Sequence, residues 1–357
     1  MIYWIADKRM YAYSGSSAKA MEIPSDVLRI YRDHIRQNAE RTDWKNSGSG
    51  AEFMRAGMGG APGGADLQQR LDGISAQIFS VLYDGKRLLY SMCIDSTGGV
   101  YVKERGMPGD GILLSDNAGG FREFSCKDKK LAISCVRGGE AHLGILEQDG
   151  EQVTVLTEGS TRESDPSWSL ACDDVIWYAG CGLAKIEPAR ASTQQQAMQI
   201  IMMNAMGQLG AEDLWKQYVE GPWSIYRFDC KAYEMQEVLT DKKTNFRQPV
   251  ETADKDLYYI AYPYRDPYVR KGLFGKKVLA TEVPRVHGIP EGDVPVLCCR
   301  SADGKVREIR KDVFTYTITS KGIYFADKQG VALLTADGRE QRIADMPHVS
   351  YISVIEE

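Results

Sequence analysis

Hydrophobic and polar residues alternate along most of this chain, a pattern typical of β-strands. Residues 76–117 show it clearly, because four short runs (AQIFSVLYDG, KRLLYSMCID, GGVYVKERG and DGILLSDN) are separated by Gly, Asp or Asn. Apolar runs of this length joined by turn residues predict four antiparallel strands. Residues 121–159 repeat the arrangement. The pattern therefore predicts an all-β protein built from four-stranded units.

Two further units are interrupted. The third unit, residues 164–243, breaks off after residue 184 and resumes at residue 223. The fourth, residues 245–312, has its break between residues 266 and 294. A fifth, unbroken unit occupies residues 313–346.

The two ends of the chain complete a sixth unit. Residues 2–23 (IYWIADKRMYAYSGSSAKAMEI) resemble residues 323–343 (IYFADKQGVALLTADGREQRI), each with an aromatic-rich strand, an Ala-Asp-Lys turn and two more strands. The fifth unit has one strand before this repeat, and only the last ten residues, 348–357, can supply that strand for the N-terminal copy. A repeat split across the termini is how a closed ring of β-blades joins its ends. Residues 1–357 are therefore predicted to form one domain, a six-bladed β-propeller whose N- and C-terminal strands share a blade.

One repeat carries a family resemblance. The sequence LTEG at residues 156–159, SDPSWS at 164–169 and VIWY at 175–178 resembles the repeat of TolB-like (WD40-like PD40) β-propellers. The chain departs from that family where LACDD at residues 170–174 replaces a Pro-Asp-Gly turn. We also expect neither the export signal nor the separate N-terminal domain of TolB. The resemblance implies a propeller fold and a binding role.

Three segments do not fit the repeating units, namely residues 27–75, 185–222 and 267–293. In an up-and-down blade the chain alternates between two ends, so links between strands two and three emerge at the same end as links between blades. All three insertions are therefore expected on one face. Elaborated loops on a rigid scaffold often carry function.

The first insertion, residues 27–75, is predicted to contain a helix followed by a glycine-rich loop. Pro24-Ser25-Asp26 is typical of a helix start, and Leu28, Tyr31 and Ile35 recur at helical spacing. Residues 46–66 are rich in glycine but lack the Gly-Lys-Ser/Thr of a phosphate-binding loop. A flexible linker is the favoured interpretation.

The second insertion, residues 185–222, is predicted to be a helical hairpin broken near residues 207–210. Its apolar stripes have two interpretations: they pack on each other and on the propeller rim, or part of them remains exposed to bind a partner. The partner-binding residues predicted here are Met198, Ile201, Met202, Met206, Leu209, Trp215 and Tyr218.

The third insertion, residues 267–293, is predicted to be a loop in which basic and aromatic residues alternate. Arg270, Lys271 and Phe274 are its predicted partner-binding residues. Such mixtures bind single-stranded nucleic acid or acidic peptides. The chain has 44 basic and 49 acidic residues and a net charge of -5, which makes nucleic acid a poor candidate. An acidic protein segment is the favoured partner.

Composition also bears on location. The eight cysteines form no CxxC pair and no Cys/His spacing suited to zinc, so free thiols in a reducing compartment are expected. Asp7, Lys8 and Arg9 follow the first apolar residues at once, which is unlike a signal peptide. No apolar run reaches the length of a membrane helix. We expect a cytoplasmic protein.

Residues with catalytic potential are sparse. The four histidines show no metal-ligand spacing, and no GxSxG motif is present. Asp165 is expected to fix a turn ahead of Pro166 rather than to act as a general acid. The sequence therefore predicts no catalytic, metal or cofactor residues and leans against an enzyme.

Two functions follow from this sequence. The favoured one is a non-catalytic protein-interaction scaffold that binds a protein partner, or a second copy of the chain, through its insertion-bearing face. The alternative is an enzyme or small-ligand binder whose insertions cap a pocket over the central channel. Its candidate residues are Arg265, Asp266, Arg285 and His287.

Overall fold

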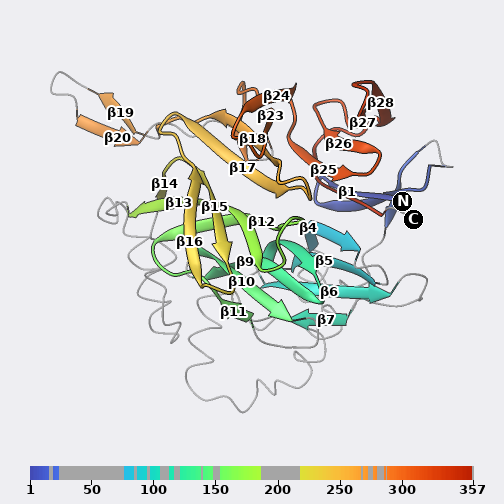
Figure 1. Cartoon of the computed structure of the whole chain (residues 1–357), viewed down its shortest axis with the longest axis horizontal. Helices are drawn as coiled ribbons and strands as arrows, with labels where there is room; N and C mark the ends of the chain where they lie inside the picture. Colours follow the sequence, from blue (N-terminus) through green and yellow to red (C-terminus); the bar gives the residue numbers. More distant parts are fainter. Residues whose placement is uncertain are drawn as a thin grey trace, which may run out of the picture.

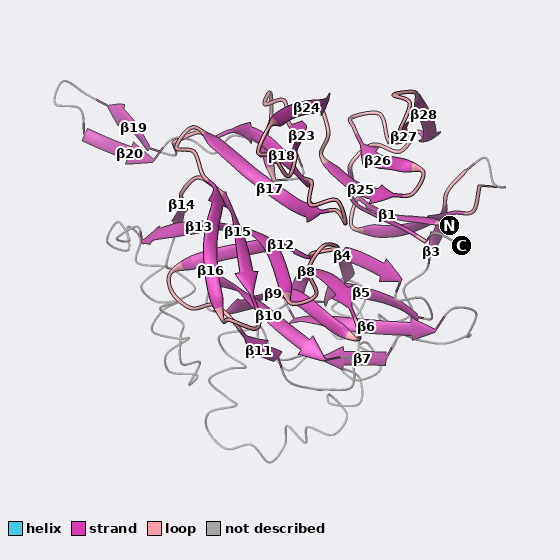
Figure 2. Ribbon diagram, in the orientation of Figure 1, coloured by secondary structure: helices cyan, strands magenta, loops and turns pink. Residues whose placement is uncertain are grey.

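In the computed structural model the described part of the chain is all-β. It comprises residues 1–355 except for 16–18, 24–75, 84–86, 95–96, 105–111, 116–120, 138–139, 148–152, 186–217, 267, 272–275, 280–284 and 287. Figure 2 shows strands and loops throughout this part, with no helix. The predicted fold class is thus confirmed at the level of secondary structure. In the same residues no helix is long and apolar enough to cross a membrane.

Three predicted units form separate antiparallel sheets whose strands pair in chain order. In each, the predicted alternation of apolar and polar residues coincides with the strands. The first sheet contains β4 (Ala76–Tyr83), β5 (Arg87–Ile94), β6 (Thr97–Glu104) and β7 (Ile112–Ser115). The second contains β17 (Thr244–Glu251), β18 (Leu257–Pro263), β23 (Val296–Arg300) and β24 (Val306–Lys311). The third contains β25 (Thr315–Thr319), β26 (Gly322–Ala326), β27 (Val331–Thr335) and β28 (Glu340–Ala344).

The predicted second and third units share one sheet of nine strands. A single parallel contact between Ala141 and Arg162 joins them. The second unit supplies β8 (Phe121–Lys127), β9 (Lys130–Arg137), β10 (Glu140–Glu147) and β11 (Val153–Val155). The third supplies β12 (Thr161–Trp168), β13 (Val175–Lys185), β14 (Tyr218–Glu220), β15 (Ser224–Asp229) and β16 (Glu234–Leu239).

The two ends of the chain meet in one sheet, as predicted. The C-terminal strand β29 (Val349–Val354) pairs with β1 (Ile2–Ala6), which continues into β2 (Arg9–Tyr13) and β3 (Met21–Ile23). The amino group of Met1 donates a hydrogen bond to the carbonyl oxygen of Ile355, 2.9 Å away. Figure 1 shows the termini side by side.

The first strands of these units follow one another in a circuit. β4 lies against β8, β8 against β12, and β12 against β17; β25 lies against β29, and β29 against β4. Hydrogen bonds from the Gln248 side chain to the Phe314 carbonyl (3.2 Å) and from the Tyr316 hydroxyl to the Gln248 carbonyl (2.6 Å) join β17 to β25. The circuit therefore closes.

Side-chain alternation on β1 fills two cores at once. Trp4 packs with Tyr324 and Leu333 of the preceding sheet, whereas its neighbour Ile5 packs with Tyr90 and other residues of the following sheet. Trp4 and Ile5 are both fully buried. Since successive residues of a strand point to opposite faces, a one-residue shift of β1 would misplace both side chains.

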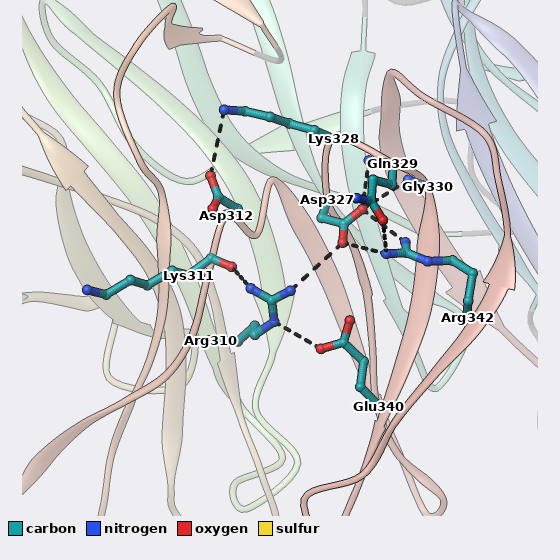
Figure 3. Close-up of polar contacts among 9 residues, drawn as sticks. All are labelled: Arg310, Lys311, Asp312, Asp327, Lys328, Gln329, Gly330, Glu340 and Arg342. Atoms are coloured by element: carbon teal, nitrogen blue, oxygen red, sulfur yellow. Dashed lines mark hydrogen bonds and ion pairs between the residues drawn. The ribbon is translucent and has the colours of Figure 1, made fainter.

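Ion pairs tie the sheet of β25–β28 to β24 (Figure 3). Asp327 is buried at the β26–β27 turn and receives two 2.9 Å hydrogen bonds from Arg342. Its Oδ1 also accepts the backbone N–H groups of Gln329 (2.8 Å) and Gly330 (3.0 Å). Arg310 of β24 lies 4.0 Å from Asp327 and 3.1 Å from Glu340. One carboxylate thus fixes a turn and links neighbouring sheets.

Parts of two insertions differ from the prediction. Tyr218–Glu220 was expected in a helix but forms β14, because its backbone pairs with the last three residues of β13. The third insertion was expected to be a loop, yet it contains β19 (Tyr268–Lys271), β20 (Lys276–Leu279), β21 (Arg285–Val286) and β22 (Ile289–Pro290). The predicted helices in residues 27–75 and 186–217 lie outside the described residues.

Candidate functional site

Of the first strands whose register shifts, β12 and β17 both have a proline within the bulge. The register shifts between Ser164 and Ser167 in β12, and between Arg247 and Val250 in β17. Asp165 and Gln248, each followed by a proline, have φ angles of 54° and 52°. Proline cannot donate to a β-ladder, so within sheets it occupies edges or bulges. A bulge bends the strand and redirects the neighbouring side chains.

Residues at the two bulges bind each other. Asp165 Oδ2 accepts hydrogen bonds from Arg247 Nε and from the backbone N–H of Gln248, the latter at 3.0 Å. Arg247 Nη2 also donates to the Ser164 hydroxyl at 3.0 Å. The Asp165 side chain is only 8% exposed, so these hydrogen bonds replace contacts with water that burial removes. Asp165 therefore lies in a strand and joins two sheets, which corrects the expectation that it fixes a turn.

The ion pair continues into a larger group. The Arg247 guanidinium lies 4.2 Å from the centre of the Trp223 ring, a cation–π contact. The Trp223 indole N–H donates to Glu220 Oε2 at 3.2 Å, and the other Glu220 oxygen accepts from Arg162. We call Arg162, Asp165, Glu220, Trp223 and Arg247 the arginine–tryptophan cluster.

The ends of two insertions meet at this cluster. Glu220 is the last residue of β14, where the chain returns from the second insertion. Its carbonyl oxygen accepts a 3.1 Å hydrogen bond from the hydroxyl of Tyr264, which stands just before the third insertion. The next residue, Arg265, forms a two-pronged ion pair with Asp293 at the end of that insertion. Side-chain contacts thus hold the bases of both insertions.

Each arginine of the cluster is ion-paired with one of its two carboxylates. The Arg162 and Arg247 side chains are 34% and 21% exposed, and guanidinium groups bind carboxylates and phosphates through paired donors. Burial, followed by the charge of Glu220, raises the pKa of the Cys181 thiol to about 12. Burial likewise raises the pKa of Tyr262. Both groups therefore remain protonated at neutral pH and are poor nucleophiles.

Other described side chains add no metal site. Within the described residues no group of three or more His, Cys, Asp and Glu could hold a metal ion. The cysteines whose side chains are described are free thiols, namely Cys126, Cys135, Cys172, Cys181, Cys230, Cys298 and Cys299.

Most predicted partner-binding residues lie outside the described part. This holds for Met198, Ile201, Met202, Met206, Leu209, Trp215 and Phe274. Tyr218 begins β14, and Arg270 and Lys271 end β19. Their role in binding stays a prediction.

The structure describes three of the four candidate residues for the small-ligand alternative. Arg265 is engaged with Asp293, Asp266 is exposed, and exposed Arg285 donates to the Gly288 carbonyl at 3.2 Å. His287 lies outside the described residues.

The sequence analysis did not identify Arg162, Glu220, Trp223 or Arg247. The sequence does contain a signal for the two bulges. Asp165-Pro166 and Gln248-Pro249 each place a polar residue before a proline inside a predicted strand. Such a pair indicates a bulge.

Comparisons with solved structures give distant matches. TolB from Acinetobacter baumannii has a TM-score of 0.48 and 12% identity, over 77% of this chain and 56% of that chain. A chain of the nidogen/laminin complex has a TM-score of 0.46 and 10% identity, over 78% of this chain and 84% of that one. A putative TolB from Agrobacterium tumefaciens has a TM-score of 0.40 and 16% identity, over 76% and 82%. Two of these are TolB structures, the family that the sequence resembles.

This chain therefore spans little more than half of the length of the A. baumannii TolB. No protein-family model matches the sequence, and the search of curated proteins finds no match.

Proposed function

We propose that this chain is a six-bladed β-propeller that acts as a non-catalytic, cytoplasmic protein-interaction scaffold. The partner is another protein or a second copy of the chain, and it binds at the end that carries the insertions. Support for six blades comes from the six runs of strands and from the circuit of first strands, which β29 and β1 complete. Such a ring leaves short, protected sheet edges and a rigid platform.

The observation that carries the binding role is the junction of two insertions at the arginine–tryptophan cluster. Glu220 and Asp293, from the ends of the second and third insertions, are ion-paired to Arg162 and Arg265. Insertions held at their bases can present a surface in a fixed position, which lowers the entropy lost on binding. Arginine and tryptophan are also enriched among the residues that contribute most to protein interfaces.

The described chemistry of this region favours binding over catalysis. Guanidinium groups are partly exposed, whereas the Cys181 thiol and the Tyr262 phenol are held in their protonated forms by burial. The Arg162–Glu220 and Arg247–Asp165 ion pairs would then lie at the edge of the interface, where charged groups affect the association rate and specificity.

The test is affinity capture from an extract of cells that express the chain, followed by reconstitution of the purified pair. The key variant replaces residues 188–215 by a short Gly-Ser linker and keeps β13 and β14, so that the base of the insertion is preserved. A control variant combines Lys231→Glu and Lys242→Glu at two exposed turns of β16. Light scattering of the purified chain reports self-association.

We expect a partner, or a dimer, that the linker variant loses and the control retains. The proposal is overturned if the intact chain remains monomeric and yields no partner that reconstitutes. A small molecule that raises the melting temperature of the intact chain but not of the linker variant would instead support a capped ligand pocket.

A further inference from the structure

The β19–β20 hairpin is a two-stranded ribbon that stands apart from the sheets. Figure 1 shows it projecting from the end of the molecule beyond β17. Among the described residues, β19 and β20 pair only with each other, and no described strand pairs with either outer edge. An isolated two-stranded hairpin has marginal stability in water. Its edges can accept another strand.

The register places like charges opposite each other near the tip. Like charges at directly opposite positions of an antiparallel pair are destabilising. Neither strand contains an acidic residue, so the register brings four basic positions together. The basic pairs are Arg270 with Lys277 and Lys271 with Lys276; the pairs nearer the base are Tyr268 with Leu279 and Val269 with Val278.

Each face of the ribbon contains one basic pair and one apolar pair. Successive residues of a strand alternate between faces, so positions 270 and 277 share a face with positions 268 and 279. Positions 271 and 276 share the other face with positions 269 and 278. From tip to base, both faces therefore present a basic pair and then an apolar pair.

We propose that this ribbon binds an acidic, extended segment of a protein partner by strand addition. The inference rests on the proposed scaffold function and adds the chemistry of the partner. A strand added along an edge also alternates between faces. Two consecutive acidic residues would then meet the two basic pairs, and two consecutive apolar residues beside them would meet the apolar pairs. The preferred sequence has adjacent, not alternating, carboxylates.

The experiment measures binding of two labelled synthetic peptides to the full chain by fluorescence anisotropy. One repeats the order Val-Val-Glu-Glu, and the other has the same composition with Val and Glu alternating. We expect the alternating peptide to bind at least about fivefold more weakly, since it places one residue type on each face. Binding should weaken with added salt because it depends on charge.

The key variant combines Arg270→Glu with Lys271→Glu. It sets a carboxylate opposite each remaining lysine, which favours the hairpin, and removes the ribbon's net positive charge. Lost peptide binding therefore cannot be explained by an unfolded ribbon. The Lys231→Glu and Lys242→Glu control makes the same change in net charge elsewhere. We expect peptide binding to fall by about tenfold or more in the key variant and by less than about twofold in the control.

Three results would overturn the inference: equal binding of the two peptides, equal loss in both variants, or tighter binding of a single-stranded oligonucleotide than of the Val-Val-Glu-Glu peptide. The scaffold proposal is tested separately. If the key variant still captures the partner in full, the ribbon inference fails and the scaffold proposal stands. If no partner is found but the peptides bind as expected, the scaffold proposal fails and the ribbon inference stands.

Discussion

Replacing Arg247 by alanine should destabilise the whole fold, because this side chain joins two sheets. The substitution removes a charged hydrogen-bond donor from the carboxylate of Asp165, whose side chain is only 8% exposed. Breaking a buried ion pair by removing one member typically costs about 3–5 kcal/mol. Arg247 is itself 21% exposed, so we take the lower end, about 3 kcal/mol.

This free energy predicts a measurable shift in melting temperature. With an unfolding entropy of about 2.1 cal/mol/K per residue, a chain of 357 residues has about 0.75 kcal/mol/K in total. A loss of about 3 kcal/mol then lowers the Tm by about 4 °C. Differential scanning calorimetry measures this change.

A matched control and a double-mutant cycle test the cause. Arg227→Ala removes an arginine that is 31% exposed and pairs with Asp229 at 3.3 Å within β15, so it should cost about 1 kcal/mol or less. Asp165→Asn keeps the shape of the side chain, and asparagine tolerates the left-handed backbone at this position. We expect Arg247→Ala and Asp165→Asn to couple by about 1–3 kcal/mol. Additive effects within about 0.5 kcal/mol would refute the reasoning.

Three further predictions concern stability. Gly330→Ala should lower the free energy of unfolding by roughly 3 kcal/mol or more, because the new Cβ would lie 2.1 Å from the Ala344 carbonyl oxygen. Gly338 has a φ of 82° but open space around it, so Gly338→Ala should lower the free energy of unfolding by only about 1 kcal/mol. Equal losses of Tm in the two variants would contradict this prediction. Burial raises the pKa of Glu163 above its ordinary 4.5, so its contribution to stability should decline as the pH rises from 4.5 through the pKa of the folded state. Glu163→Gln should therefore make the Tm less dependent on pH in that range. Despite burial, hydrogen bonds from Arg342 and from the Gln329 and Gly330 backbone lower the pKa of Asp327. The stabilisation by its carboxylate is therefore present above pH 3.8 and is lost as the pH falls through the pKa of the folded state. Asp327→Asn should lower the free energy of unfolding by about 2 kcal/mol at pH 7, and the difference in Tm between this variant and the original chain should shrink in acid.

The strands and the closure of the chain could be predicted because both depend on local patterns. Period-two alternation identified the strands of residues 76–117, and the likeness of residues 2–23 to 323–343 identified the shared sheet. The cluster could not be found in this way, since its contacts join residues far apart in sequence. Arg162 and Glu220 are separated by 58 positions, and Asp165 and Arg247 by 82.

The error at residue 218 has a related cause. Tyr218 and Val219 continue an apolar spacing that suits a helix, but the end of β13 offers unpaired backbone groups to the returning chain. Pairing with Ala184 and Lys185 satisfies these groups, and tertiary context outweighs local propensity. The β19–β20 ribbon has a different origin, because among the described residues its two strands pair only with each other.

Charge distribution connects the scaffold proposal with the ribbon. A chain with a net charge of -5 repels acidic partners at long range. Its basic positions must then be concentrated if an acidic segment is to bind, and the ribbon holds four of them on two short strands. Repulsion elsewhere would help to orient the partner, so that the net acidity of the chain increases selectivity for this one end. Raising the ionic strength should therefore weaken both affinity and selectivity, because it screens attraction at the ribbon and repulsion elsewhere together.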